Sequence, residues 1–350
     1  MTLKEKISGK KILFFSVQTF NLEKEIKQKM EENGAIVTYY DERPSNNNFS
    51  KGIIRLKRSF YQKKIDAYYQ NILKTTAKID FDFLFVNRGE VITATFLEEF
   101  KLQQPNCELI FFTWDSFTNH AHPTTILKYF NKRFSFDFED AKKYNIGFRP
   151  LFYLDKYKNN KNFDVSKKKY DLLFLGTAHS DRYLISTEVS NWSSKNGLSA
   201  FTFYYMHSKA VYWYKKAFDK SFKAFDYKKL SFNSLSTDEI VNLYKISNVI
   251  LDINHPGQKG LTMRTFEAIG SGKKMITTNA EVKKYPFYSP DVFYVIDRNA
   301  IVLDKTFFTS PVVPIPENLY YKCSIEGWLG DIFLKSEKED WKSLMNLQYL

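Results

Sequence analysis

The stretch HPGQKGLTMRTFEAIGSGKKMITTN, His255–Asn279, decides the fold of the second half of the chain. It follows an apolar run, Ser247–Asn254 (SNVILDIN), that is typical of a buried strand. A polar loop with two glycines then leads into a helical pattern, and KKMITTN begins another strand. A strand, a helix and a second strand in this order form a βαβ unit, and such units build parallel sheets.

The same alternation of strands and helices extends toward the N-terminus. Lys10–Val17 and Cys107–Ser116 are apolar strands, and Ile79–Glu90 is a strand followed by a polar loop. Asn21–Gly34 has the pattern of a helix, with Asn21 as its N-cap and a glycine at its end. The first half is therefore also expected to form a parallel sheet covered by helices.

The pattern restarts after a lysine- and asparagine-rich segment at Asp155–Lys169. We therefore predict an α/β protein with two Rossmann-like domains, each built on a parallel sheet. Ser236–Glu239 (STDE) is a capping box that begins a helix of the second domain. The predicted boundaries are an N-terminal Rossmann-like domain at 1–150, a linker at 151–168, a second Rossmann-like domain at 169–322, and helices at 323–350 that pack across the junction.

Charge and composition limit the class of protein. The 350 residues carry a formal net charge of +13, from 52 Lys+Arg against 39 Asp+Glu. Such an excess favours anionic partners, namely nucleotides, nucleic acid or an anionic membrane surface. No apolar run approaches the roughly 18 residues of a membrane span, and Ile12–Val17 is expected to be a first strand and not a signal peptide. Cys107 and Cys323 fit no disulfide or metal pattern, so we expect a cytoplasmic protein.

Two glycine-bearing strand ends in the second half point to an anion site. These are Leu175–Arg182 and Asp252–Glu267. Ligands of parallel α/β sheets bind beyond the carboxyl ends of strands, and helix N-termini present free N–H groups to anions. Arg182, Lys259 and Arg264 can neutralise a diphosphate, while Glu267, three residues after Arg264, can accept the hydroxyls of a ribose. The alternative is a surface ion pair on a helix, worth about 0.2–0.5 kcal/mol.

Other nucleotide-binding motifs are missing from the sequence. GxxxxGK followed by Ser or Thr does not occur, which argues against P-loop ATPases and kinases. GxGxxG does not occur either, which argues against a nicotinamide dehydrogenase. Gly270-Ser271-Gly272 follows a helix and is expected to end it.

With these motifs the chain resembles the GT-B glycosyltransferases, in particular the nucleotide-sugar-dependent enzymes of bacterial lipopolysaccharide, capsule and exopolysaccharide assembly. The likeness lies in LYKISNVILDIN, GLTMRTFEAIGSGKKMITTN and FYVID, and more weakly in the two-domain layout. It implies a GT-B-like fold, with the two parallel sheets facing each other across a cleft, an acceptor-side domain at 1–150 and a nucleotide-sugar donor domain at 169–322. It also implies transfer of a sugar from a nucleoside-diphosphate-sugar to a glycan or lipid-linked glycan. It also implies a chain without a bound metal or other cofactor, at the inner face of the cell membrane or free in the cytoplasm.

The resemblance implies roles for particular residues. Glu267 would bind the donor ribose, and Arg264 with Lys259 would hold the diphosphate. Many retaining members carry Glu-x7-Glu, but Lys259 stands where the first glutamate would fall, which leaves the stereochemistry open. The further donor-side residues are Gly176, Thr177, Arg182, Gly260, Thr262 and Thr265.

The acceptor side needs a general base in the first domain if the transfer inverts the configuration. Asp115, just past the strand in FFTWDSFTNH, is the first candidate, and Glu90 in FLFVNRGE is the second. Asp115 can equally be a turn or helix-capping residue. His120 and His122 lie nearby, but a lone HxH does not define a metal site, and no metal is predicted.

Two further stretches combine basic and aromatic residues at helical spacing. Ser50–Lys74 and Lys209–Lys229 could each lie on an anionic membrane surface, or each could be a helix with a buried stripe and a solvated lysine face. Two functional alternatives also stay open. One is a nucleotide-sugar epimerase of the same fold, and the other is a basic nucleic-acid-binding or modifying protein, for which the sequence shows no recognised module.

Overall fold

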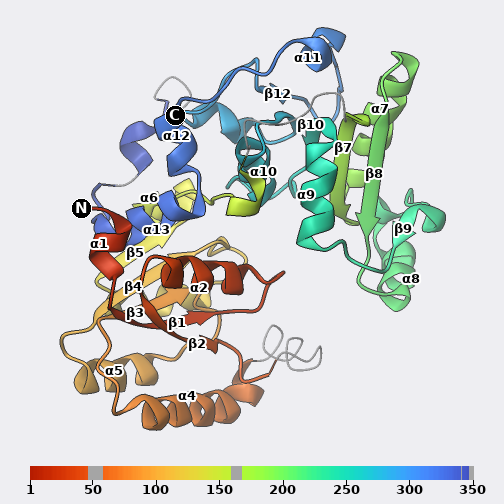
Figure 1. The fold of residues 1–350 in the computed structure, drawn as a ribbon. Helices are drawn as coiled ribbons and strands as arrows, with labels where there is room; N and C mark the ends of the chain where they lie inside the picture. The colour runs from red at the N-terminus through yellow and green to blue at the C-terminus, as the bar shows by residue number, and fades with distance from the viewer. Residues whose placement is uncertain (46–57, 159–167, 340, 347–350) are drawn as a thin grey trace. The chain divides into compact units, whose positions relative to one another are not determined.

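The computed structural model describes residues 1–45, 58–158, 168–339 and 341–346, which divide into two compact units (Figure 1). The first unit contains Met1–Leu151 together with Ile325–Ser343. The second contains Phe152–Ser324 together with the end of the chain from Leu344. Each unit is built around one parallel sheet, as the alternation of strands and helices predicts.

The sheet of the first unit has six strands in the order β2-β1-β3-β4-β5-β6. Every pairing in it is parallel, so all the carboxyl ends lie at one edge. The strands are nearly continuous apolar runs because both faces are covered. Their bounds are β1 Lys11–Ser16, β2 Ile36–Asp41, β3 Phe83–Asn87, β4 Glu108–Thr113, β5 Lys132–Ser135 and β6 Gly147–Phe148.

Helices from both ends of the chain cover this sheet. On one face the ring of Phe15 contacts Tyr69 of α4 and Phe96 of α5, with ring centroids 5.7 and 5.5 Å away. The helices of this unit are α1 Leu3–Ile7, α2 Leu22–Glu32, α4 Gln62–Thr76, α5 Ala94–Gln103, α6 Phe138–Lys143 and α13 Ile325–Leu334, with short 3-10 turns η1 Arg58–Tyr61, η2 His122–Thr125, η3 Leu127–Tyr129 and η9 Trp341–Leu344.

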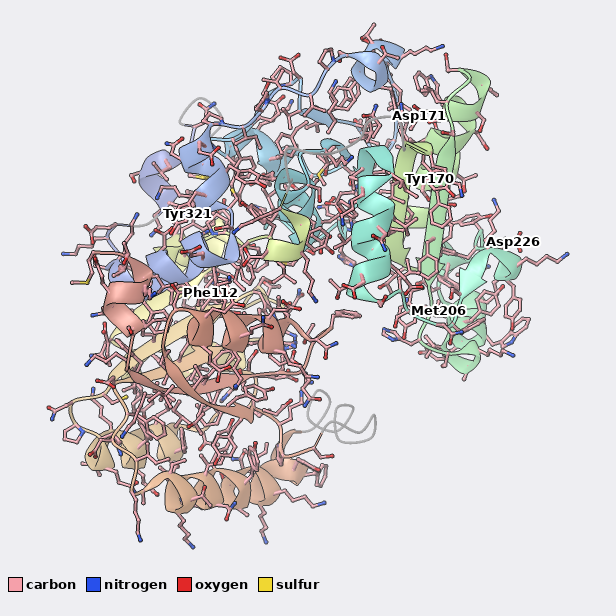
Figure 2. The ribbon with its side chains drawn as sticks, in the orientation of Figure 1. Phe112, Tyr170, Asp171, Met206, Asp226 and Tyr321 are labelled. Atoms are coloured by element: carbon pink, nitrogen blue, oxygen red, sulfur yellow. The ribbon has the colours of Figure 1, made fainter. Side chains whose placement is uncertain are left out.

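The C-terminal helix α13 belongs to the core of the first unit. Trp328 is fully buried, and its ring lies 4.9 Å from that of Phe112 in β4, which Figure 2 labels, and 5.9 Å from that of Phe85 in β3. Asp331 on the same helix forms an ion pair with Arg149, whose Nε lies 2.9 Å from Asp331 Oδ2, and it accepts a hydrogen bond from Trp341 Nε1 at 3.0 Å. The helical tail predicted from the sequence therefore returns to the N-terminal region.

The sheet of the second unit also has six parallel strands, in the order β12-β11-β10-β7-β8-β9. The strands are β7 Tyr170–Thr177, β8 Ala200–Tyr205, β9 Leu230–Ser231, β10 Ser247–Asp252, β11 Lys274–Thr277 and β12 Phe293–Val295. The helices are α7 Arg182–Lys195, α8 Lys209–Phe218, α9 Thr237–Lys245, α10 Met263–Gly270, α11 Lys305–Thr309 and α12 Glu317–Lys322, with 3-10 turns η4 Asp155–Tyr157, η6 Lys220–Phe222, η7 Tyr227–Lys229 and η8 Ala280–Lys284.

The helix ends mostly follow the sequence signals. The capping box at Ser236 is confirmed, since the Ser236 hydroxyl accepts from the Glu239 amide while the Glu239 carboxylate accepts from the Ser236 amide. Gly272 has φ +60° just past the end of α10, as expected for a helix C-terminus. Asn21 does occupy the N-cap of α2, but its φ is +61° and its side chain makes no capping bond.

The two basic stretches are described to different extents. Residues 50–57 of Ser50–Lys74 lie outside the described residues, whereas Lys209–Lys229 is described and forms α8, η6 and η7. None of the helices in the described part of the chain has the length and apolar character needed to cross a membrane.

Candidate functional site

The carboxyl edge of the second unit's sheet gathers all three arginines of that unit. Arg182 begins α7 after β7, Arg264 lies in the first turn of α10 after β10, and Arg298 follows β12. The pKa of Arg182 is lowered to about 10, chiefly by burial and also by the neighbouring guanidinium groups of Arg264 and Arg298, with Asp252 opposing the shift in part. Three cations this close in space create a site where an anion is favoured.

Arg182 links two of the strand ends. Its Nε donates to the carbonyl of Ile253 at 2.8 Å and its Nη1 to that of Thr177 at 3.2 Å. The guanidinium lies against Gly176, where an added Cβ would come within 3.3 Å of Arg182 Nη1 and 2.9 Å of the Phe174 ring. The predicted residues Gly176, Thr177 and Arg182 are thus in contact, and the glycine provides the space that the arginine occupies.

Arg298 is a residue of this edge that the sequence analysis did not single out. Its Nη1 donates to both carboxylate oxygens of Asp181, at 2.9 and 2.8 Å. Its Nη2 donates to Asn254 Oδ1 at 2.6 Å and to the hydroxyl of Thr278 at 3.0 Å. Arg298 therefore joins the loops after β7, β10 and β11. Its only sequence signal was a position after the short strand FYVID.

Arg264 has hydrogen-bond donor capacity that none of the described residues uses. Its Nη1 is buried without a hydrogen-bond partner among the described residues, and its Nε lies 3.8 Å from Asp252 at the end of β10. Thr262, the N-cap residue of α10, donates its hydroxyl to the other oxygen of Asp252 at 3.0 Å. An unsatisfied buried guanidinium nitrogen costs free energy unless a ligand or water accepts from it.

Glu267 lies beside Arg264 and is held by tyrosines. Tyr244 of α9 is fully buried and donates its hydroxyl to Glu267 Oε2 at 3.1 Å. The ring of Tyr157 packs edge-on against that of Tyr244, with centroids 5.5 Å apart. Burial raises the pKa of Glu267, and Arg264 counters this only in part. Burial, and next the Glu267 charge, raise the pKa of both tyrosines, which keeps their hydroxyls protonated as donors.

The glycine loop before α10 is fixed from both neighbouring strand ends. Asn254 Nδ2 donates to the carbonyl of Gln258 at 2.8 Å, and Asn279 Nδ2 donates to that of Lys259 at 3.1 Å. Lys259 has an exposed side chain, whereas Gly260 is buried. Thr265, a predicted site residue, is only 2% exposed and lies inside the helix packing.

Two histidines meet at the same edge. The rings of His179, after β7, and His255, after β10, have centroids 5.7 Å apart. The pKa of His179 is lowered to about 3, chiefly by burial and next by the charge of Arg182. His179 is therefore a neutral hydrogen-bonding group at physiological pH.

The candidate acceptor-side residues gather at the carboxyl edge of the first unit's sheet. Arg88 Nη2 lies 3.0 Å from Asp115 Oδ2, and Arg88 Nη1 lies 3.3 Å from Glu90 Oε2. His120 Nε2 lies 3.4 Å from the same oxygen of Asp115. Arg88 thus connects both predicted carboxylates, although Asp115 follows β4 and Glu90 follows β3.

The two carboxylates differ in access. The side chain of Asp115 is 29% exposed, whereas that of Glu90 is 4% exposed and also pairs with the buried Arg43. Burial alone would raise the pKa of Glu90, but the charges of Arg88 and Arg43 outweigh it and hold that pKa below its usual value. A buried carboxylate bound by two guanidinium groups is a poor proton acceptor, so Asp115 is the better placed of the two.

A third carboxyl group, Glu42, supports the loop that carries Arg88. It is fully buried after β2, and its Oε1 accepts from the amide of Gly89 at 2.8 Å while Oε2 accepts from that of Glu90. Arg88 and Gly89 have φ of +105° and +71°, so the loop adopts a conformation that favours glycine. The pKa of Glu42 is raised to about 8, chiefly by burial; the Gly89 amide opposes the shift and the charge of Glu90 adds to it.

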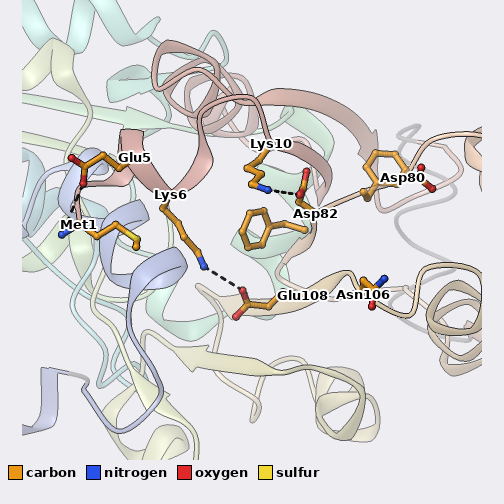
Figure 3. Close-up of a pocket in the computed structure, with 10 residues that line it drawn as sticks. Met1, Glu5, Lys6, Lys10, Asp80, Asp82, Asn106 and Glu108 are labelled. Carbon is orange, nitrogen blue, oxygen red and sulfur yellow. Dashed lines mark hydrogen bonds and ion pairs between the residues drawn. The ribbon is translucent and has the colours of Figure 1, made fainter.

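A cavity of about 440 Å³ in the first unit lies at the opposite end of the sheet (Figure 3). Lys10 Nζ pairs there with Asp82 at 2.8 Å, and Lys6 Nζ lies 4.0 Å from Glu108. These residues precede or begin β1, β3 and β4, so the cavity lies at the amino ends of the strands. Ligands of parallel α/β sheets bind at the carboxyl ends, and we therefore assign no site to this cavity.

Comparisons with known proteins identify the fold. No family model matches the sequence, and no curated protein matches it. Among solved structures, the chain is similar to an alpha-glucosyltransferase in complex with UDP and a 13-mer DNA containing a central A:G mismatch, with 12% identity, TM-score 0.59, and 95% of this chain and 98% of that one covered. It is also similar to sucrose-phosphate synthase from Thermosynechococcus elongatus, with 10% identity, TM-score 0.56, and 97% and 96% covered.

A third similar structure is that of an Anabaena protein in complex with UDP-glucose, with 9% identity, TM-score 0.56, and 92% and 98% of the two chains covered. All three likenesses extend over nearly the whole chain, although few residues are identical. The chain therefore has a GT-B-like α/β fold, as the sequence predicts, and it shares that fold with glycosyltransferases.

Proposed function

We propose that the chain is a glycosyltransferase that moves a sugar from a nucleoside-diphosphate-sugar to a glycan or lipid-linked acceptor of a bacterial surface polysaccharide. The proposed binding of the nucleotide-sugar donor rests on the position of Arg264. It lies in the first turn of α10, directly after a glycine-bearing loop, with a buried nitrogen that no described residue satisfies. A diphosphate oxygen is the acceptor that such a guanidinium group suits.

The remaining donor contacts follow from the same edge. Arg264 and the exposed Lys259 would bind the diphosphate, with Gly260 and Thr262 at the loop that approaches it. Arg182 adds positive charge, but two of its N–H groups already donate to carbonyls, so its part is to hold the edge and to attract the anion. Glu267 would accept ribose hydroxyls, because Tyr244 binds one of its oxygens and fixes its orientation.

For the acceptor half, we propose Asp115 as the general base. It is the more exposed of the two predicted carboxylates, and His120 lies beside it. Removing the proton of an acceptor hydroxyl would raise its nucleophilicity toward the anomeric carbon, while the nucleoside diphosphate leaves with its negative charge held by arginines. Glu90 would act through Arg88, which it helps to position.

Two observations favour a second candidate, transfer to nucleic acid. One of the structurally similar glucosyltransferases was solved with DNA, and this chain carries a net charge of +13. A nucleic-acid acceptor would give binding whose affinity falls steeply with salt. Duplex binding that is weak and independent of salt at low ionic strength would exclude this candidate.

The ribose assignment tests the donor proposal directly. Glu267→Gln should lower the affinity for a nucleoside diphosphate about tenfold, since a hydrogen bond to a charged group contributes roughly 1.5–3 kcal/mol. Isothermal titration calorimetry of the variant should be run beside Glu281→Gln, a carboxylate that pairs with Lys284 in η8. A 2′-deoxy nucleotide should lose affinity for the parent chain but not for Glu267→Gln. An equal loss in both proteins would contradict the assignment.

A further inference from the structure

The helix α8 presents an exposed aromatic face in the second unit. Tyr214 is 67% exposed and Phe218 76% exposed, and Val211 is 36% exposed. These residues stand at positions i, i+3 and i+7 of the helix, so they lie on one face. Trp213, 62% exposed, lies toward the adjoining side of the same helix. Large exposed apolar faces of this kind mark interaction surfaces.

The opposite side of α8 packs against the second unit, which fixes the orientation of the helix and therefore of its exposed face. Tyr212 is 3% exposed, and its ring contacts that of the fully buried Phe222 at 5.7 Å. Lys216 Nζ donates to the carbonyls of Lys223 and Phe225, which ties the segment after the helix back to it. Ser208 caps the helix by accepting from the amide of Val211. A helix with only a buried stripe and a solvated lysine face, the alternative drawn from the sequence, does not expose these aromatic rings.

Basic residues surround the aromatic face. The segment 209–229 contains seven lysines and two aspartates, Asp219 and Asp226, the second of which Figure 2 labels. Five of these lysines are exposed; they lie on α8, on the turns η6 and η7, and in the segment that joins these two turns. The exposed lysines are Lys209, Lys220, Lys223, Lys228 and Lys229.

We propose that α8 and its surrounding lysines form a surface that docks on an anionic lipid bilayer. A lipid surface meets both features at once, because aromatic rings insert at the headgroup level while lysine ammonium groups contact the anionic headgroups. Repulsion between like charges argues against a second copy of this chain as the partner, since two such lysine-rich surfaces would repel each other. The Tyr214 and Phe218 rings are tilted at 44° with centroids 5.1 Å apart, a ridge suited to insertion more than to stacking of flat bases.

The position of α8 connects this surface to the donor site. The helix follows the carboxyl end of β8, which pairs in parallel with β7, so α8 lies at the same sheet edge as Gly176 and Arg182. In Figure 1, α8 lies beyond the arrowhead of β8. A docked bilayer would therefore meet the second unit at the end where the nucleotide is proposed to bind. The docking itself goes beyond the proposed function and does not depend on it.

The test is cosedimentation of the full chain with vesicles. Vesicles of phosphatidylcholine containing one-third phosphatidylglycerol should bind the chain, and pure phosphatidylcholine vesicles should bind it at least tenfold more weakly. The double variant Tyr214→Ser/Phe218→Ser should lose most of the binding. Leu102→Ser, which changes an 83% exposed apolar residue on α5 of the first unit, should bind as the parent does.

A second pair of variants tests the charge separately from the aromatic face. Lys220→Glu/Lys223→Glu should weaken binding by more than tenfold, since each lysine near an anionic surface contributes about fivefold. Trp213 fluorescence should shift to shorter wavelength on binding, and Trp213→Phe should abolish that shift. Equal binding to neutral vesicles, or double variants that bind like the parent, would overturn the proposal. The proposal would also be overturned if the aromatic variant kept its lipid binding but lost binding to single-stranded oligonucleotides. Loss of a dimer in that variant, with lipid binding kept, would overturn it as well.

Discussion

Single arginines organise both candidate sites. In the first unit Arg88 pairs with both Asp115 and Glu90. In the second, Arg264 lies 3.8 Å from Asp252, interacts electrostatically with Glu267, and keeps one buried nitrogen that no described residue satisfies. A guanidinium group keeps its charge when buried and offers several donors in one plane, so it can bind a carboxylate and still face a ligand. Lysine could not serve both purposes at these positions.

Asp115→Asn should reduce sugar transfer by about 10²–10⁴-fold, the usual contribution of a general base. Its donor affinity should be nearly unchanged, because the nucleotide is proposed to bind the second unit. Turnover of the purified variant should be compared with that of Asp304→Asn, which changes the N-cap of α11. Transfer at the parental rate would leave Asp115 as only a partner of Arg88.

The stability of the protein should depend on pH through Glu42. Its pKa is about 8 in the folded protein, against 4.5 for an ordinary glutamate, so the folded state takes up a proton that the unfolded chain releases. The contribution of this group to stability is therefore fully present below pH 4.5 and is lost as the pH rises toward 8.

Glu42→Gln removes that titration. Relative to the parent, the variant should gain at least about 1 kcal/mol of unfolding free energy between pH 5 and pH 8. Urea unfolding at a series of pH values measures the difference. A difference that stays constant with pH would show that Glu42 is ionised throughout.

At the scale of elements, the βαβ pattern predicted most of what positions the sites. The strand ends at Gly176 and Asp252 and the helix with Arg264 and Glu267 were visible from sequence because apolar runs and glycines are local signals. Arg298, Tyr157 and Tyr244 were not, because their partners lie far away in sequence. The same holds for Glu42, whose carboxyl group accepts from the amides of Gly89 and Glu90. These two residues follow it by 47 and 48 positions in the sequence.

The end of α10 should tolerate no side chain at Gly270. An added Cβ would lie 2.5 Å from Cγ of Tyr153, and the Gly270 carbonyl accepts from the Tyr320 hydroxyl at 2.8 Å. Gly270→Ala should therefore destabilise the second unit by about 1–3 kcal/mol through overpacking.

Gly330→Ala is the matched control for this change. Gly330 lies within α13 and has no atom within 4 Å of an added Cβ, so alanine there should leave stability unchanged or raise it by up to about 1 kcal/mol. Denaturation midpoints of the two variants compare them. Equal midpoints would mean that Tyr153 yields to the added methyl group.

At the scale of the whole molecule, the chain builds two sheets of the same kind and returns to the first with its C-terminal helix. Trp328 and Phe333 of α13 pack on Phe85, so residues 325–343 complete a core that began near the N-terminus. Sequence periodicity predicted the helix and its return. The domain boundaries, at 150, 168 and 322, stay predictions, and so do the roles of the site residues and the identity of the acceptor.

The central claim is that the second unit binds a nucleoside diphosphate through Arg264. Calorimetry with UDP and with uridine should be run on the parent chain, on Arg264→Ala, and on Arg133→Ala, which removes the same charge from an ion pair with Glu337 in the first unit. We predict that Arg264→Ala loses about 10–100-fold in affinity for UDP and little for uridine, while Arg133→Ala binds both as the parent does. Equal affinity of Arg264→Ala and the parent for UDP, or equal losses for UDP and uridine, would contradict the account.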